Sequence, residues 1–573
     1  MKRTVTVPDA LVLVWIVAAG VGMALAAAAA MEPPSYDPMS YVVKAHGFWD
    51  AITNGRMVNP FGLGPSVRPP GTILVSYPFG FSPDFRWFYF RTCFIPLLML
   101  AAAVYIAGYK RDQSAPERWM LAALAVTLGG LPTLYQFQYN EPMPAASFWG
   151  LVDNFIAGAS AIGMAAALRS VREQSWRWAL VAALGGALAL MIKPAGLLVM
   201  AVIGMAWMIL IASARGWRFA KLRADAAGYA FAVKGLTAAV IVYVLVVLSA
   251  FATHYFSPSN IAFGSQVLKV MNSTILSTLD ADMVILMIRI SFGFAIPFVI
   301  AVGFGAGLAA PAARGAVLAA LLCFVTGVWF WIVETDVALA RYALPFAAMT
   351  FVALVPPLLM MAARTRQRAV VAGGALAAAL PTLIIAVMMF TPDASLRVQK
   401  ALGVNLAANL FQAESDQALA LMAKMKADGE LKAPVYLFHT TSALRNFAAG
   451  LMYPSFLEPA GPQPSLRLPM DWQRSTTFRI GELATSRYIA FEPVADEAKR
   501  QAIVARGAKD FAEEYELISA VFTDLTDADG LCTVSETRVR VLEVCRPEAF
   551  EATLARLKQA HNWTPAFREA NAD

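Results

Sequence analysis

Long apolar segments separated by short polar connections occupy the first two thirds of the chain. A helix needs roughly 20 apolar residues to cross a hydrocarbon core of about 30 Å. About eleven segments satisfy this template. They lie near 10–30, 87–109, 119–134, 147–168, 178–192, 195–212, 235–253, 283–309, 315–333, 343–362 and 369–390. This pattern predicts a polytopic α-helical membrane protein.

The composition supports the same class. Hydrophobic residues make up 58% of the 573 positions, charged residues only 15%, and the mean hydropathy is +0.58. Such a chain cannot be a water-soluble globule. The first apolar run follows Lys2 and Arg3, as a secretory signal would. It is longer than the roughly 7–15 residue core of a signal peptide, so we interpret it as an uncleaved helix.

Basic residues gather in every second connection, and this alternation predicts the orientation. Cytoplasmic connections are enriched in Lys and Arg. The residues concerned are Lys2, Arg3, Lys110, Arg111, Arg118, Arg169, Arg172, Arg177, Arg215, Arg218, Lys221, Arg223, Arg314, Arg364, Arg366 and Arg368. The connection 31–86 and everything after Thr391 are then expected to face outward. The net charge of +7 is a topological signal of this kind, and we expect no nucleic-acid partner.

Beyond Thr391 charged residues become frequent and apolar runs shrink to strand length. The sequence therefore predicts two domains, a transmembrane module over 1–390 and a soluble α/β domain over 391–573 on the outer face. A Pro-rich loop is expected over 453–469. Strands are expected at 435–438, 488–491, 517–522 and 539–544, and helices at 409–427, 495–506 and 547–560.

The four cysteines fall into two pairs. Cys93 and Cys323 lie in apolar runs, whereas Cys532 and Cys545 flank an expected hairpin in the outer domain. In an oxidising compartment the second pair is expected to form a disulfide. Two unpaired thiols are the alternative.

The first outward loop, 31–86, is too rich in polar and aromatic residues to be a simple connector. Loops longer than about 15 residues are usually functional or disordered, and the aromatic content argues against disorder. An amphipathic helix at the membrane surface is expected near 41–53. The candidate binding and catalytic residues of this loop are Asp37, Tyr41, Lys44, His46 and Arg68.

Four motifs, taken in order, resemble the polyprenol-dependent GT-C glycosyltransferases, and most closely the protein mannosyltransferases and lipid A aminoarabinose transferases. The first is Asp37 with Tyr41 and Arg68-Pro69-Pro70, just after the first helix. The others contain Asp153 at the start of the fourth helix, Lys193-Pro194 between the fifth and sixth, and Arg341-Tyr342 entering the tenth. The resemblance spans the whole chain and implies a GT-C fold.

The resemblance implies an inverting transfer of a hexose, pentose or amino sugar from a polyprenyl-phosphate carrier to an acceptor hydroxyl. Direct displacement needs a base, and a partly desolvated Asp suits this task. The departing phosphate needs fixed positive charge. Asp37 is the expected base, assisted by Asp153. The expected phosphate-binding residues are Arg68, Arg341 and Lys193, and the expected substrate-binding residues are Tyr41, Lys44, His46 and Glu141.

Each assignment has a structural alternative. Asp37 and Asp153 could cap helices or turns, and Arg68 could anchor the loop at the interface. Lys193 and Arg341 could extend to the membrane surface without binding substrate. Many relatives have two adjacent acids in the first loop, but here Pro38 follows Asp37. We therefore expect no resident metal or other cofactor, although carboxylates elsewhere could bind a divalent cation.

A transporter or flippase for a lipid-linked or anionic substrate is the alternative function. The sequence lacks the paired broken helices of inverted-repeat transporters, and its polar residues cluster at helix ends. It also contains no P-loop and no HExxH motif. We expect a multi-pass protein of a bacterial inner membrane whose site faces the periplasm, with membrane lipids, the lipid-linked sugar and a glycan, lipid or protein acceptor as partners.

Overall fold

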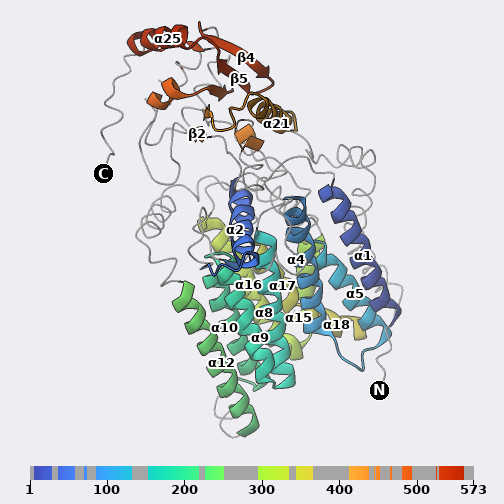
Figure 1. Cartoon of the computed structure of the whole chain (residues 1–573). Helices are drawn as coiled ribbons and strands as arrows, with labels where there is room; N and C mark the ends of the chain where they lie inside the picture. The colour runs from blue at the N-terminus through green and yellow to red at the C-terminus, as the bar shows by residue number, and fades with distance from the viewer. Residues whose placement is uncertain are drawn as a thin grey trace. The chain divides into compact units, whose positions relative to one another are not determined.

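In the computed structural model the chain forms two compact units (Figure 1). One unit contains the helices of the first two thirds of the chain, and the other contains a small sheet with its helices. The residues described are 6–28, 36–58, 70–71, 73, 85–131, 152–217, 226–250, 295–334, 343–364, 412–437, 444, 447–448, 450–451, 465–467, 480–492, 520, 524–525 and 528–560.

Twelve α-helices of the helical unit fall within the described residues. Six candidate spans among them are long and apolar enough to cross a membrane. The helices are α1 (Val7–Ala28), α2 (Tyr36–Thr53), α4 (Phe85–Gly108), α5 (Ala115–Gly129), α8 (Asp153–Glu173), α9 (Trp176–Ile192), α10 (Gly196–Ala214), α12 (Ala226–Ala250), α15 (Ala295–Leu308), α16 (Arg314–Glu334), α17 (Leu344–Ala353) and α18 (Val355–Arg364).

The apolar runs overlap these helices, with two differences. The run 343–362 forms two helices, α17 and α18, because Pro356 and Pro357 have no N–H groups to continue the hydrogen bonding of α17. Helix α12 begins at Ala226, nine residues before the expected 235, and includes Lys234. The run 369–390 lies outside the described residues, so the expected count of eleven stays a prediction.

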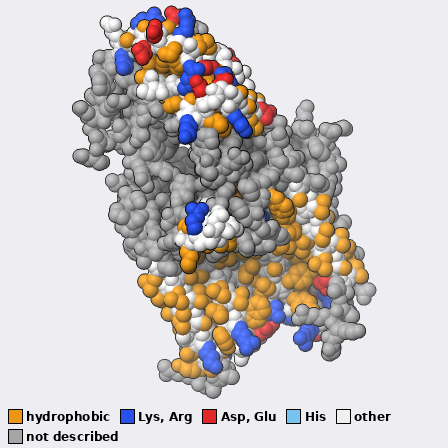
Figure 2. Space-filling model, in the orientation of Figure 1, with side chains coloured by type: hydrophobic (Ala, Val, Ile, Leu, Met, Phe, Trp, Pro, Cys, Tyr) orange, Lys and Arg blue, Asp and Glu red, His pale blue; other side chains and the backbone are white. Residues whose placement is uncertain are grey.

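Exposed apolar side chains cover the outside of the helical unit. On α12, Leu236, Ile241 and Leu245 are 53%, 53% and 63% exposed. Figure 2 shows hydrophobic side chains over the visible face of this unit, with Lys and Arg side chains gathered mostly toward its lower edge. An apolar surface of this extent is stable only when lipid covers it. The described helices therefore form a multi-pass membrane protein.

Helices α8 and α9 approach closely through glycines. A Cβ at Gly185 would lie 2.7 Å from both the N and the Cα of Gly163. Small residues at helix contacts let backbones approach in membranes, where packing replaces the hydrophobic effect as the driving force. The two helices are antiparallel, joined by a short turn at Gln174 and Ser175, so the start of α8 and the end of α9 lie at one end of the unit.

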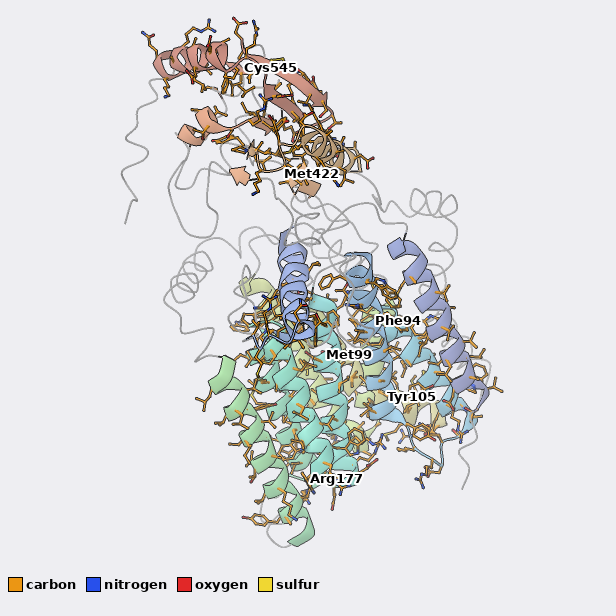
Figure 3. The ribbon with its side chains drawn as sticks, viewed as in Figure 1. Phe94, Met99, Tyr105, Arg177, Met422 and Cys545 are labelled. Atoms are coloured by element: carbon orange, nitrogen blue, oxygen red, sulfur yellow. A yellow bond between two sulfur atoms is a disulfide. The ribbon has the colours of Figure 1, made fainter. Side chains whose placement is uncertain are left out.

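The basic connections lie at the opposite end. Arg172, near the end of α8, donates from Nη1 to the backbone oxygen of Ala107 at 2.8 Å, which joins the ends of α8 and α4. The start of α16 packs on the end of α10, where a Cβ at Gly315 would lie 2.7 Å from Ser213. In Figure 3, Arg177 lies toward this end of the unit. The described connections that are rich in basic residues thus lie together at one end of the helical unit.

The second unit is a five-stranded mixed sheet with the strand order β2-β1-β3-β5-β4. Strand β1 is parallel to β2 and β3, whereas β5 is antiparallel to β3 and β4. The elements are α21 (Gln412–Ala427), β1 (Pro434–Leu437), β2 (Ser465–Arg467), β3 (Tyr488–Phe491), β4 (Leu531–Glu536), β5 (Arg540–Val544) and α25 (Pro547–Ala560).

Most of these elements lie where the sequence predicts them. Strand β2 is an exception, because it lies within 453–469, which the prolines had suggested to be a loop. Strand β4 is another, because no strand range was expected over 531–536, although a hairpin was expected between the two cysteines. The expected helix at 495–506 and most of the expected strand at 517–522 lie outside the described residues. Ala520, the one described residue of that expected strand, is helical, so the strand prediction is wrong at this position. A core forms between α21 and the sheet from residues such as Leu421, Val435 and Val541. A disulfide joins Cys532 of β4 to Cys545 just after β5, with a Cα–Cα distance of 5.8 Å.

The close approach of α8 and α9 predicts unequal effects of two glycine substitutions. Gly185→Ala should lower the thermal midpoint in detergent, because overpacking a tight contact costs about 1–3 kcal/mol. Gly204→Ala on α10 is the matched control, since a Cβ there meets nothing within 4 Å. Equal midpoints for the two variants would contradict the close packing of α8 on α9.

Candidate functional site

An ion pair joins the start of α8 to the end of α9. Lys193 Nζ lies 2.7 Å from Asp153 Oδ1, and the two residues are only 7% and 2% exposed. Asp153 is the first residue of α8, where the positive end of the helix dipole favours a carboxylate. Lys193 follows the last residue of α9 in an extended conformation, which the next residue, Pro194, favours.

The tight turn after Lys193 explains the Lys193-Pro-Ala-Gly196 motif. A Cβ at Gly196 would lie 2.1 Å from the backbone nitrogen of Leu190. Only glycine therefore permits α10 to begin directly against the last turn of α9. Pro194 ends one helix and Gly196 starts the next, so this motif holds Lys193 at the junction.

The motif that follows Arg68 packs on the same junction. A Cβ at Gly71 would lie 2.6 Å from the backbone oxygen of Met191 and 2.9 Å from the nitrogen of Ile192. Pro70 and Gly71 are buried. The first-loop motif and the Lys193 motif, far apart in sequence, thus meet at the end of α9.

Helix α2 packs on this segment through Ile73. The Trp49 indole N–H donates to the backbone oxygen of Ile73 at 3.3 Å, and Ala45 and Phe48 form a buried cluster with its side chain. Helix α2 therefore has a fixed position beside the segment that continues from Arg68.

One face of α2 contains three of the expected site residues. Asp37, Tyr41 and Lys44 follow the i, i+4, i+7 spacing of a single helical face. Tyr41 and Lys44 are each 1% exposed. The structure describes the backbone of Asp37 in α2 but not its side chain. His46 lies about half a helical turn away, on the opposite side of α2, so the helix does not place it with the other three.

Burial changes the acidity of Lys44. Desolvation lowers the pKa of its ammonium group from 10.5 to about 8. A lysine of this kind is sensitive to a nearby negative charge, which would restore its protonated form.

Two buried polar residues of this unit were missed by the sequence interpretation. Arg91 of α4 is 3% exposed and Asn154 of α8 is 0% exposed. A charged residue inside an apolar run is itself a functional signal, and Arg91 lies within the run 87–109. The sequence contains no comparable functional signal at Asn154, apart from its position next to Asp153.

The remaining expected site residues lie outside the described part of the chain. These are Arg68, Glu141 and Arg341, together with the side chains of Asp37 and His46. Their roles stay predictions. Within the described residues no group of three or more His, Cys, Asp or Glu side chains could bind a metal ion.

The buried charges of the helical unit are predominantly positive. Among its described residues, the buried charged side chains are Lys44, Arg91, Lys193 and Asp153, three cations against one carboxylate. Buried charge is costly unless it is compensated. Arg and Lys side chains of this kind can bind phosphate and carboxylate groups.

No protein-family model and no curated protein matches the chain by sequence. Solved structures similar to it include ArnT from Cupriavidus metallidurans in the apo state, at 13% identity and a TM-score of 0.47, covering 95% of this chain and 99% of ArnT. The same enzyme bound to undecaprenyl phosphate gives 14% identity and a TM-score of 0.47, covering 92% and 97%.

An oligosaccharyltransferase from Archaeoglobus fulgidus, tethered to an acceptor peptide, gives 12% identity and a TM-score of 0.44, covering 87% of this chain and 72% of the enzyme.

The Asp153–Lys193 pair predicts strong coupling between two substitutions. Asp153→Asn should destabilise the protein by about 3–5 kcal/mol, because it leaves a buried ammonium without its carboxylate. The double variant Asp153→Asn, Lys193→Met should recover much of this loss. Thermal unfolding of the wild type, both single variants and the double variant gives the coupling free energy between the two residues. Additive effects would contradict the pairing.

The lowered pKa of Lys44 predicts how stability depends on pH. Between pH 8 and 10.5 the unfolded chain binds more protons at this residue than the folded chain, so stability rises with pH through this window. The burial cost is fully present below pH 8. Lys44→Met removes this cost, so its advantage in thermal midpoint over the wild type should shrink from pH 7 to pH 10.5. Lys110→Met, at an exposed position, is the control and should show no such trend.

Proposed function

We propose that the chain is an inverting glycosyltransferase that moves a sugar from a polyprenyl-phosphate donor to an acceptor hydroxyl. The observation that carries the proposal is the presence of three buried cations, Lys44, Arg91 and Lys193, in the described part of the helical unit. A phosphate leaving group needs fixed positive charge where its negative charge develops. The carrier itself is inferred from the resemblance of the sequence motifs.

Asp37 acts as the base that takes the proton of the acceptor hydroxyl as it attacks the anomeric carbon. Lys193 and the predicted cations Arg68 and Arg341 bind the departing phosphate. Asp153 holds Lys193 in place through the ion pair and is thus a positioning residue. Tyr41 and Lys44, on the Asp37 face of α2, contact the donor or the acceptor, as does Glu141.

The reaction takes place on the outer side of a bacterial inner membrane. The support for this sidedness is that the basic connections lie at one end of the helical unit and the Asp153–Lys193 pair at the other. The soluble unit, which follows the helices in the chain, then faces the periplasm. The acceptor is a glycan, a lipid or a protein, and no divalent metal is required.

A transporter or flippase for the same lipid-linked substrate is the second candidate. The buried charge of Arg91 within a candidate span favours it, because charged groups at membrane depth often line a transport path. Such a protein would bind the lipid-linked sugar without cleaving it.

The base assignment predicts a selective loss of transfer. Asp37→Asn should reduce transfer by roughly 100-fold or more, because general-base catalysis contributes about 10²–10⁴-fold. Donor binding should persist. The assay compares transfer from a panel of polyprenyl-phosphate sugars to extracted cell-envelope material and measures donor binding separately.

Asp112→Asn is the matched control, since Asp112 is exposed at the basic end and should leave transfer unchanged. Undiminished transfer by Asp37→Asn would remove this residue from catalysis. Donor binding without transfer by the wild type, across the whole panel, would favour the transporter.

A further inference from the structure

Arg91 is a buried guanidinium with open hydrogen-bonding positions. It lies six residues into α4 and is 3% exposed. Within the described chain, neither Nε nor Nη2 of Arg91 has a hydrogen-bond partner. Buried polar groups of folded proteins are almost always paired, so these two donors need an explanation.

The positions of the two unpaired N–H donors of Arg91 indicate which kind of acceptor they can bind. The N–H groups of Nε and Nη2 point from the same edge of the planar guanidinium. This edge forms two parallel hydrogen bonds with an acceptor that offers two oxygens, such as a phosphate or a carboxylate.

A second buried residue with open positions lies on the neighbouring helix. Asn154 is 0% exposed, and both Nδ2 and Oδ1 of its carboxamide lack hydrogen-bond partners in the described structure. A carboxamide can donate to a phosphate oxygen and also accept from a hydroxyl. One ligand that contains both groups would satisfy both atoms.

The packing of α4 on α8 places the two residues toward the same end of the unit. Met99 of α4 packs directly on α8, because a Cβ at Gly158 would lie 2.9 Å from the Met99 Cβ. Both helices run from this contact toward the Ala107–Arg172 contact, so they are parallel. Figure 3 shows Met99 between Phe94 and Tyr105 along α4.

On α8, Asn154 lies one turn before Gly158, nearer the start of the helix and on the same face. On α4, Arg91 lies two turns before Met99, along the same i±4 row of side chains. Side chains of helices lean toward the helix start. Arg91 and Asn154 therefore lie on adjoining helices at the end of the unit that contains the Asp153–Lys193 pair, and Asn154 directly follows Asp153.

We propose that the Nε/Nη2 edge of Arg91 and the carboxamide of Asn154 bind the phosphate group of the lipid-linked donor. Arg91 donates two hydrogen bonds to phosphate oxygens, and Asn154 Nδ2 donates a third. Asn154 Oδ1 accepts a hydrogen bond from a hydroxyl group of the lipid-linked sugar. The identity of the lipid in this inference rests on the proposed function. The phosphate is inferred from the unpaired polar atoms of Arg91 and Asn154.

Thermal unfolding in detergent tests the proposal, with a long-chain polyprenyl phosphate and the corresponding polyprenol as probes. Without a ligand, Arg91→Met should unfold at the wild-type temperature or above it, because it removes an uncompensated buried charge. Polyprenyl phosphate should raise the midpoint of the wild type, whereas polyprenol should not. Arg91→Met should lose this rise and bind the phosphate about tenfold or more weakly.

Two further variants separate charge from geometry. Arg91→Lys keeps the charge but loses the two-pronged edge, so its affinity should fall between those of the wild type and Arg91→Met. Asn154→Leu should weaken phosphate binding several-fold through the loss of the Nδ2 donor. Unchanged phosphate binding by Asn154→Leu would overturn its part in the site.

Arg172→Gln is the matched control at the opposite end of the unit. It removes the hydrogen bond to Ala107 and should lower the midpoint, yet it should retain the full rise with polyprenyl phosphate. A lower midpoint of Arg91→Met with an undiminished rise would show that Arg91 is merely structural and would overturn the proposal. An equal rise with inorganic phosphate alone would overturn the assignment to a lipid-linked donor.

The test is independent of transfer. If the wild type shows the phosphate-dependent rise and Arg91→Met loses it while no sugar is transferred, the proposed enzyme activity fails and the phosphate site stands. If sugar is transferred and Arg91→Met binds polyprenyl phosphate as the wild type does, the phosphate site fails and the enzyme activity stands.

Discussion

The helical unit depends on one buried ion pair at the junction of three helices. Lys193 and Asp153 lie where α9 ends, α8 begins and α10 starts, and they are 2.7 Å apart in a region closed to solvent. A buried pair of this kind contributes little net stability, because desolvation offsets most of the attraction. Its effect is to fix geometry, since the attraction between the two charges holds the start of α8 against the end of α9. Gly71 and Gly196 add contacts that tolerate no side chain, so the surrounding backbone has little freedom.

The elements of this unit follow from the sequence because lipid imposes a simple rule on it. Every backbone polar group in the hydrocarbon region must be satisfied within its own helix, so helix positions follow from hydropathy alone. This rule does not predict where a helix breaks within an apolar run. The break before Val355 requires the additional knowledge that a proline pair cannot continue a helix. Strand β2, only three residues long in a Pro-rich stretch, is held by its neighbour β1 and has no local pattern of its own.

The sequence names individual candidate residues for the site, but it does not show how they are arranged in space. Asp153 and Lys193 stood out because they lie in sequence motifs that resemble those of the GT-C glycosyltransferases. Their pairing spans 40 positions and depends on the antiparallel packing of α8 and α9. The contact of Gly71 with the end of α9 is likewise a backbone contact, and spacing cannot reveal it. The burial of Arg91 and Asn154 and their unpaired polar atoms depend on tertiary packing, which the sequence does not reveal.

The disulfide of the second unit has a consequence for the order in which the molecule matures. Cys532 and Cys545 come after the described helices of the membrane part in the chain, and they are separated by 13 positions. Domains generally fold in the order of synthesis, so the helices enter the membrane before this covalent bond closes. Helix insertion depends on hydropathy, whereas closure of the bond depends on an oxidant and takes seconds to hours. A newly made molecule therefore passes through a stage in which its membrane part is assembled while its β4–β5 hairpin is still reduced.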